Sequence, residues 1–467
     1  MAKGYLPYTI DQRLLLPPDM REWLPEGHLA LFLSDVVDEL DLGALYAERD
    51  SGDARGRRGF HPAMMVKLLM YAYCVGKPSS RKIERATFED VAFRVLSADQ
   101  HPDHDSIADF RKRHLEALGG LFGQVLVLCQ KAGLVKLGHV AIDGTKMGAN
   151  ASKHKAMSYG RMGEAEKKLQ EEVQRLLAEA ERIDAEEDAQ FGRGNRGDEL
   201  PEQLRRRESR LNKIREAKAA LEAQAKEQAE QQAAQVKAKL EERAKKEAET
   251  GKKPGGHPPA VPDVQQAKPE PNAQRNFTDP DSRIMPDGAN KGSFMQGYNA
   301  QIAVDGEAQV IVAVDVVQAP NDKQQLAPML EKVERNVGIP RVTSADTGYF
   351  GEPTIDKLQD RGIELLVPPN RQAHGEPAVV ATPVSDDAST TERMRAKVKS
   401  AAGAALYRMR KAIVEPVFGQ IKSVRGLRRF LLRGLENVGN EFRLIALTHN
   451  LLKLHRRVGV LALGVGA

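Results

Sequence analysis

One long segment of low complexity, from about Gly163 to Glu249, constrains the fold of this chain most. It is built almost entirely from Ala, Glu, Lys, Gln and Arg. Its apolar residues recur at steps of three and four, the seam spacing of a coiled coil. One arm carries Leu169, Val173, Leu176, Ala180 and Ile183, and the other carries Leu204, Leu211, Ile214 and Leu221. A glycine-rich break and Pro201, which suits the first position of a helix, separate the arms, so we expect a helical hairpin.

Strand patterns lie on both sides of this segment. Residues 138–149 predict a strand and a turn before it. After it, residues 298–304 and 308–314 flank Asp305-Gly306, which is a hairpin turn signal. A helix, a strand ending at Asp346, a second helix and a last strand follow. We therefore expect a mixed α/β domain, a sheet with helices, that the hairpin interrupts.

These patterns divide the chain into five segments, each named here by what we expect of it. They are a helical domain at 1–135, the first part of the α/β domain at 136–160, the helical hairpin at 161–250, a flexible Pro/Gly-rich linker at 251–275, and the rest of the α/β domain with basic C-terminal helices at 276–467.

Bulk features exclude several classes of protein. No run of 18 apolar residues exists, so we expect no membrane span. The N-terminal residues lack the layout of a signal peptide. Cys74 and Cys129 are isolated, which argues against a disulfide framework and against a zinc site. A cytoplasmic protein is the expected class.

Positive charge is concentrated at the C-terminal end. From residue 401 onward there are twelve Lys and Arg against three Glu, a net charge of +9, whereas the whole chain carries only +5. Such a segment is typical of proteins that contact phosphates, although a solvated helix face would have the same composition. We favour a nucleic-acid partner because an acid, Glu415, lies within the basic cluster.

Two acids that follow apolar strands are candidate metal ligands. Asp143 follows Val-Ala-Ile, and Asp346 follows a short β-branched run. A carboxylate in such a context is costly unless it is paired or bound to metal. Other acids have ordinary explanations: Asp305 belongs to the hairpin turn, and Asp322 would cap the helix after it. Asp143, Asp346 and Glu415 together are the ligand set that we expect.

The helix around Glu415 supplies candidate DNA contacts. Arg408, Lys411, Glu415, Phe418 and Lys422 follow one another at steps of three and four, and therefore share one helix face. On this interpretation Arg408, Lys411 and Lys422 contact the DNA backbone, and Tyr407 stacks on the strand end. Lys146 and Asn150, just past the first strand, are further candidates for DNA contact.

Several motifs resemble those of one family. They are SRKIER at 80–85, PDH at 102–104 followed by Ile107 and Phe110-Arg111, DGTK at 143–146, QGYNAQ at 296–301 and VEPVFG at 414–419. In this order they resemble bacterial insertion-sequence DDE transposases of the insertion-sequence 1182 type, whose catalytic domain has the RNase H-like fold. Tyr407 to Lys422 is similar to the family's Tyr–Arg–Glu–Lys signature. Arg410 keeps the spacing from Tyr407, while helix geometry favours Arg408 or Lys411 for the signature Arg.

The resemblance implies a function and its requirements. Asp143, Asp346 and Glu415 would hold two Mg²⁺ ions roughly 4 Å apart, with Mn²⁺ as a plausible substitute. The expected reaction is cleavage and strand transfer of insertion-sequence DNA ends, by a nucleoid-associated homodimer bound to terminal inverted repeats and target DNA. The helical segment 1–135 would bind those repeats and dimerise. The alternatives are an inert DNA-binding protein descended from a transposase, and an RNase H-like nuclease that cuts without joining.

Overall fold

The chain divides into two compact units. A computed structural model describes residues 19–50, 59–191, 202–250, 257, 259–288, 292–359, 361–370, 385 and 388–462. The first unit combines Met1–Gly148 with Tyr298–Ala467, and the second is Ala149–Gly297. Part of the predicted break between the helical arms, at 192–197, and part of the predicted linker, at 251–256, lie outside the described residues.

The first unit begins with short helices. They are η1 (Met20–Trp23), α1 (Leu29–Glu39), α2 (Gly43–Asp50), α3 (Pro62–Cys74), α4 (Ser80–Glu89), α5 (Val91–Leu96), α6 (His104–Arg113) and α7 (Leu115–Lys131). Helix α3 begins with Pro62, whose missing N–H costs nothing at a first helical position, and nearly all of its side chains are buried. The carboxylate of Asp103 caps α6 by accepting from the backbone N–H of Ser106 at 2.8 Å.

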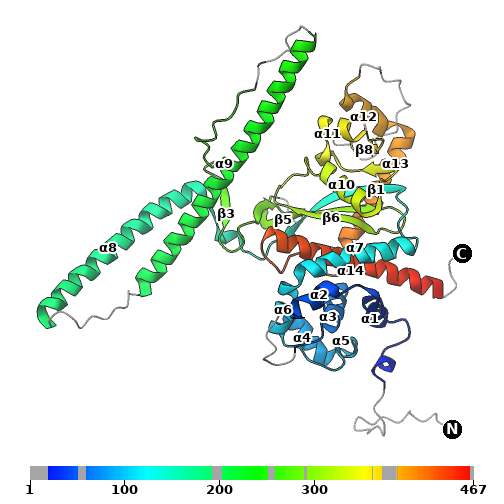
Figure 1. The fold of residues 1–467 in the computed structure, drawn as a ribbon, viewed down its shortest axis with the longest axis horizontal. Coiled ribbons are helices and arrows are strands. Elements are labelled where there is room, and N and C mark those ends of the chain that lie inside the picture. The colour runs from blue at the N-terminus through cyan, green and yellow to red at the C-terminus, as the bar shows by residue number, and fades with distance from the viewer. Residues whose placement is uncertain are drawn as a thin grey trace, which may run out of the picture. The chain divides into compact units, whose positions relative to one another are not determined.

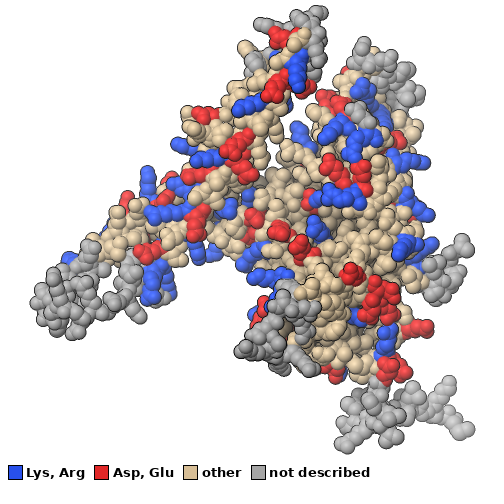
Figure 2. Space-filling view, viewed as in Figure 1, with Lys and Arg blue, Asp and Glu red and all other residues tan. Residues whose placement is uncertain are grey.

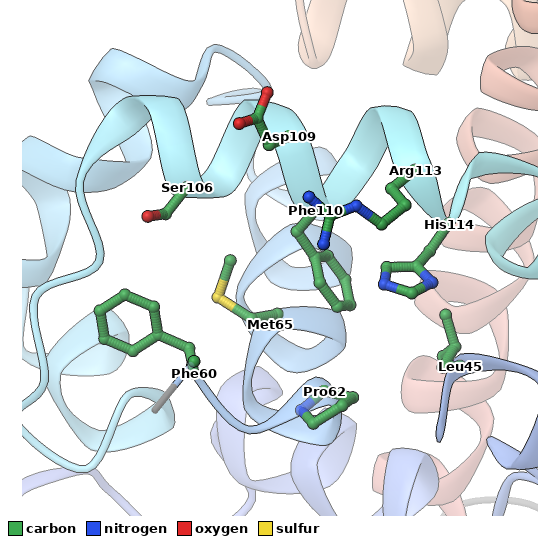
Figure 3. Close-up of a pocket in the computed structure, with 10 residues that line it drawn as sticks. Leu45, Phe60, Pro62, Met65, Ser106, Asp109, Phe110, Arg113 and His114 are labelled. Carbon is green, nitrogen blue, oxygen red and sulfur yellow. The ribbon is translucent and has the colours of Figure 1, made fainter. Parts of the chain in front are cut away.

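A pocket of about 550 Å³ lies among these helices. Figure 3 shows Phe60, Met65 and Phe110 beside it, while Ser106 and Asp109 follow the α6 side. Its lining is mostly apolar near α3 and polar along α6.

A mixed six-stranded sheet forms the centre of the α/β part. Its strands are β1 (His139–Gly148), β4 (Arg283–Pro286), β5 (Phe294–Asp305), β6 (Ile311–Val317), β7 (Val342–Ser344) and β8 (Glu364–Leu366). They lie in the order β4-β5-β1-β7-β8, with β6 also paired to β5. Strand β7 is parallel to β1 and to β8, whereas β5 and β6 are antiparallel. The predicted mixed α/β class is confirmed.

Backbone bonds fix how β1 and β5 run. Gly306 N–H donates to His139 O at 2.9 Å, and Ala149 N–H donates to Gln296 O at 2.9 Å. Since the partner number falls as the β1 number rises, the two strands are antiparallel. The turn after β5 follows the predicted Asp-Gly pattern, and the buried Asp305 carboxylate accepts from Leu137 N–H at 2.7 Å.

Helices cover both faces of this sheet. They are α10 (Leu326–Val337), α11 (Glu352–Gln359), α12 (Thr390–Lys399), α13 (Ala401–Gly419) and α14 (Leu435–Ala462), with a 3₁₀ turn η3 (Thr347–Tyr349) and a π-helix η4 (Gln420–Val424). Strand β6 lies between α10 and α14 and contacts both, and α14 also packs along α7 (Figure 1).

The second unit contains the two longest helices. It consists of η2 (Lys153–Lys155), β2 (Ala156–Ser158), α8 (Tyr159–Phe191), α9 (Glu202–Thr250), β3 (Gln274–Asn276) and β4 with the start of β5. Ion pairs join Arg207 to Glu172 at 3.0 Å and Arg215 to Glu166 at 3.1 Å, so α8 and α9 run antiparallel. Met162, Leu211 and Ile214 lie in the buried seam. Lys and Arg alternate with Asp and Glu along both helices in Figure 2.

None of the described helices is both long enough and apolar enough to cross a membrane.

Helix α14 carries a buried acid that ties the first unit together. The Glu441 carboxylate accepts from Tyr73 O–H at 3.0 Å and from the backbone N–H groups of Leu431 and Leu432 at 3.0 Å. Burial raises the pKa of Glu441, against the pull of these donors. The carboxylate therefore joins α3, the loop before α14 and α14 itself.

We predict that Glu441→Ala lowers the free energy of unfolding by roughly 2–4 kcal/mol, because it leaves several buried donors without an acceptor. Chemical denaturation monitored by circular dichroism measures this. Glu436→Ala, an exposed acid in the first turn of the same helix, is the control and should cost less than about 1 kcal/mol. Equal losses in the two variants would contradict the role given to Glu441.

Candidate active site

The sheet register places Asp143 beside Asp346. Strand β1 pairs with β7 in parallel, with His139 opposite Val342 and Ala141 opposite Ser344. Continued two residues past the end of β7, this register leads to Asp143 and Asp346, and the charge of Asp346 raises the pKa of Asp143. Asp346 begins the turn η3, where its carboxylate accepts from Gly348 N–H at 2.8 Å. Two acids distant in sequence therefore meet where β7 ends.

A guanidinium from α13 reaches this pair. Arg410 Nη1 donates to Asp143 Oδ2 at 3.0 Å, and the two side chains are only 10% and 21% exposed. Tyr407, one helical turn before, lies with its ring 5.7 Å from the Arg410 guanidinium, a cation–π contact. Arg410, rather than Arg408 or Lys411, is thus the basic residue that contacts Asp143. Both of those alternatives are exposed on α13.

Burial outweighs the Arg410 charge at the two acids. The pKa of Asp143 is raised to about 6, chiefly by burial and further by Asp346, although Arg410 lowers it. Burial also raises the pKa of Asp346, against the pull of Arg410 and the Gly348 N–H. One guanidinium does not offset the burial of two partly buried carboxylates. A further cation near Asp143 and Asp346 would stabilise their charged forms.

The opposite face of β1 carries a second polar group. Side chains alternate along a strand, so Gly144 and Lys146 leave β1 on the other side from Asp143, but the long Lys146 side chain brings its ammonium within electrostatic reach of Asp143 and Asp346. A Cβ on Gly144 would lie 2.8 Å from Asp322 Oδ1 and closer still to Gln301 Nε2. Glycine is needed there because the neighbouring side chains occupy the space that a methyl group would take.

Asp322 is the site residue that the sequence analysis missed. Its expected role as a helix cap is wrong: α10 is capped at Gln325, and Asp322 Oδ1 accepts from Asn299 Nδ2 and Gln301 Nε2, each at 2.6 Å. The available signal was a pair of amides two residues apart in the apolar strand β5. Both are fully buried, so they needed a polar partner.

Glu415 is not joined to the two aspartates. It is exposed on α13, and no hydrogen bond to Asp143 or Asp346 is found among the described residues. Across the same described ranges, no group of three His, Cys, Asp or Glu side chains is placed to hold a metal ion. Asp143 and Asp346 nevertheless fit a divalent cation, since adjacent carboxylate oxygens with uncompensated charge are the ligands that Mg²⁺ and Mn²⁺ prefer.

The remaining predicted DNA contacts lie near β1. Lys422 Nζ donates to Thr145 Oγ1 and to Lys146 O, both at 2.8 Å, and so ties η4 to the strand that carries Asp143. Lys146 Nζ lies 3.7 Å from Asp322. Asn150 follows β1 and belongs to the second unit.

An irregularity in α13 lies close to Glu415. Pro416 stands inside the helix and cannot donate to the carbonyl four residues before it. That carbonyl, of Ala412, accepts instead from Gln309 Nε2 at 2.9 Å. The π-helix η4 begins four residues after Pro416, and such segments are frequent at functional sites.

Two parts of the chain match known families. Residues 264–451 match a family described as "Transposase DDE domain", and residues 18–113 match "Transposase domain (DUF772)". Both matches support an insertion-sequence transposase. A DDE domain indicates an enzyme of the nuclease or transposase class that binds DNA, and such domains generally use divalent metal ions. Asp346 and Glu415 lie within the matched residues, whereas Asp143 precedes them. No curated protein and no solved structure matches the chain.

We predict that Asp143→Asn stabilises the metal-free protein at pH 7 by roughly 1–3 kcal/mol. The folded-state pKa of about 6 exceeds the ordinary 3.8, so protonation favours the folded state. The stabilising effect of the proton is complete below about pH 4 and is lost as the pH rises through 6.

Urea unfolding in EDTA at pH 4, 6 and 7 measures this difference, which should vanish at pH 4. Asp38→Asn, an exposed acid paired with Lys67 at 2.7 Å, is the control and should show no such pH trend. A variant less stable than wild type at pH 7 would mean that the Arg410 pair outweighs the burial of Asp143.

Proposed function

We propose that this protein is a DDE transposase that cleaves insertion-sequence ends and transfers the freed strands to target DNA. The observation that carries the proposal is the approach of Asp143 and Asp346 past the end of β7, with Arg410 bonded to Asp143. Matches to two transposase domains support it from the sequence side. The mixed sheet, with an antiparallel hairpin on one side of β1 and parallel strands on the other, supports an RNase H-like fold.

The metal would be held by Asp143 and Asp346, with Glu415 as the third ligand of the proposed set. When bound, a divalent cation of the Mg²⁺ or Mn²⁺ type would supply charge stabilisation at the phosphate and a nucleophilic oxygen at neutral pH. Two ions are proposed, as for other enzymes that displace phosphodiester oxygens.

The chain's own residues would bind and orient DNA. Arg408 and Lys411 are exposed on α13, where they can contact backbone phosphates. Arg410 is held against Asp143 by its bond and by Tyr407, so its guanidinium lies beside the place where a scissile phosphate would bind. Lys422 holds β1 against η4 and keeps the strand that carries Asp143 in place.

Other parts of the protein would organise the DNA ends. We propose that the N-terminal helices bind the terminal repeats and that the protein acts as a homodimer, since two ends must be joined. The α8–α9 pair would act as a coiled coil. We propose that the transposase is of the insertion-sequence 1182 type and that it is associated with the nucleoid.

We predict that Asp346→Asn abolishes both cleavage and strand transfer while DNA binding persists. The purified protein is incubated with Mg²⁺ and labelled DNA that carries the terminal repeats bordering its reading frame. Products are separated on denaturing gels. The loss should be at least about a hundredfold, as expected when several kcal/mol of charge stabilisation are removed.

Asp315→Asn is the matched control, because Asp315 lies on the same sheet and pairs with Lys332 at 2.7 Å. It should cleave like wild type. Nicks without joined products in wild type would favour a nuclease, and binding without any cleavage would favour an inert DNA-binding protein.

We also predict that the three acids contribute unequally to Mn²⁺ binding by the DNA-free protein. Asp143→Asn and Asp346→Asn should each weaken Mn²⁺ binding about tenfold or more, because these acids are already adjacent. Glu415→Gln should leave this binding nearly unchanged yet reduce cleavage. Electron paramagnetic resonance of free Mn²⁺ measures the affinity. Strong loss of affinity in Glu415→Gln would contradict the exposed position of that acid.

A further inference from the structure

Asp322 does not cap α10, whose N-cap is Gln325, and its side chain bonds to strand β5 instead. Its Oδ1 accepts from both Asn299 Nδ2 and Gln301 Nε2 at 2.6 Å. The donors stand two residues apart on β5 and therefore point to the same face of the sheet. Two neutral amides on one oxygen fix the carboxylate without neutralising its charge. The two amides therefore hold the Asp322 carboxylate in one orientation and leave its negative charge to be met by another group.

The amides connect Asp322 to the turn that carries Asp346. Gln301 Oε1 accepts from the buried Tyr349 hydroxyl, and Tyr349 closes the turn η3, three residues after Asp346. Asn299 Nδ2 also donates to Ala319 O at 3.1 Å. A shift of the Asp322 side chain would therefore move hydrogen-bonded side chains of β5 and η3.

The charged partner of Asp322 is Lys146. Lys146 Nζ lies 3.7 Å from Asp322 Oδ1, and the two side chains are 18% and 19% exposed. Burial lowers the pKa of Lys146, while Asp322 first, and then Asp346 and Asp143, raise it. The ammonium group thus lies near all three acids and nearest to Asp322. At 3.7 Å the pair is longer than a hydrogen bond, so the ammonium keeps donors for another acceptor.

A buried acceptor in the same place lacks a partner. Asn299 is fully buried, and its Oδ1 has no hydrogen bond from any described residue. It lies 3.1 Å from the position of a Cβ on Gly144, beside Asp322. An unsatisfied buried carbonyl is costly unless a water or a ligand group meets it. The arrangement is therefore suited to receive a group that bears a donor.

We propose that Asp322 is a positioning residue of the reaction proposed above: it holds the Lys146 ammonium beside Asp143 and Asp346, where that ammonium receives an oxygen of the DNA phosphate. This inference rests on the proposed function. The unsatisfied Asn299 carbonyl would accept from a water bound with that phosphate. Asp322 itself touches neither DNA nor the reacting atoms.

A double-mutant cycle tests whether Asp322 acts through Lys146. Asp322→Asn should reduce the rate of DNA cleavage about 10–100-fold, the usual cost of losing an outer partner. DNA affinity should stay the same or rise, because a negative charge is removed. Lys146→Met should reduce the rate similarly or more, and the double variant should lose no more than Lys146→Met alone. Additive losses, or a cleavage rate unchanged in Asp322→Asn, would overturn the proposal.

Asp315→Asn with Lys332→Met is the matched control, because this pair has similar exposure and lies outside the site. Neither variant should change the cleavage rate. Thermal unfolding of each variant shows whether a loss of rate reflects a loss of fold.

A second measurement does not need cleavage. Acetylation of Lys146 by acetic anhydride, followed by mass spectrometry, should rise several-fold in Asp322→Asn relative to Lys332 in the same sample, because the ion pair no longer holds the amine charged. An unchanged ratio would overturn the pairing. If wild type fails to cleave while this ratio rises, the proposed function fails and the Asp322–Lys146 pairing stands.

Discussion

Two partly buried carboxylates lie near one guanidinium in this protein, and the arrangement around the site follows from that imbalance. Burial raises the pKa of both Asp143 and Asp346; the charge of Asp346 further raises the pKa of Asp143, and the charge of Asp322 further raises that of Asp346. Arg410 offsets only part of this cost. In a partly buried place the remaining negative charge must be met by a proton or by a cation. The same carboxylates whose charge is costly to bury are those that would bind a metal well.

Successive side chains of β1 contact different parts of the protein, because side chains alternate along a strand. Asp143 and Thr145 face α13 and η4, where Arg410 and Lys422 bond to them. Gly144 and Lys146 face β5 and Asp322. A single strand therefore carries both the proposed metal ligand and the lysine that we propose binds phosphate, and the ammonium of that lysine lies near the same acids. The lack of a side chain at Gly144 is what lets the amides of β5 come close to β1.

Local patterns predicted the strands and helices, but not which helix face packs inward. The hairpin around Asp305-Gly306, the strand before Asp346 and the helix α11 follow from periodicity and turn chemistry. The sequence singled out Asp143 and Asp346 as candidates because an acid that follows an apolar run is costly unless it is paired or bound to metal. For α13, the stripe of Arg408, Lys411 and Glu415 has helical spacing but is exposed.

The inward stripe of α13 is Arg410, Ile413, Val414 and Val417. Arg410 is the one cation on this otherwise apolar stripe. Charge spacing alone does not pick it out, because the apolar positions of the helix have to be considered as well. Asp322 could not be found this way, since its role depends on two amides from β5 and on a register that no local window contains.

The position of Glu415 along α13 agrees with the proposed triad, whereas its angle around the helix does not. Arg410 and Lys422 bond to β1 at Asp143 and Thr145, which are two residues or about 7 Å apart along the strand. Their own Cα atoms are twelve residues apart, roughly 18 Å along a helix. The two side chains must therefore converge on β1, and Glu415 lies between them. Five residues after Arg410, however, Glu415 points about 140° away around the helix. Bringing it onto the aspartates requires a change in winding, and Pro416 and η4, which already break the regular bonding of this helix, are where such a change would cost least.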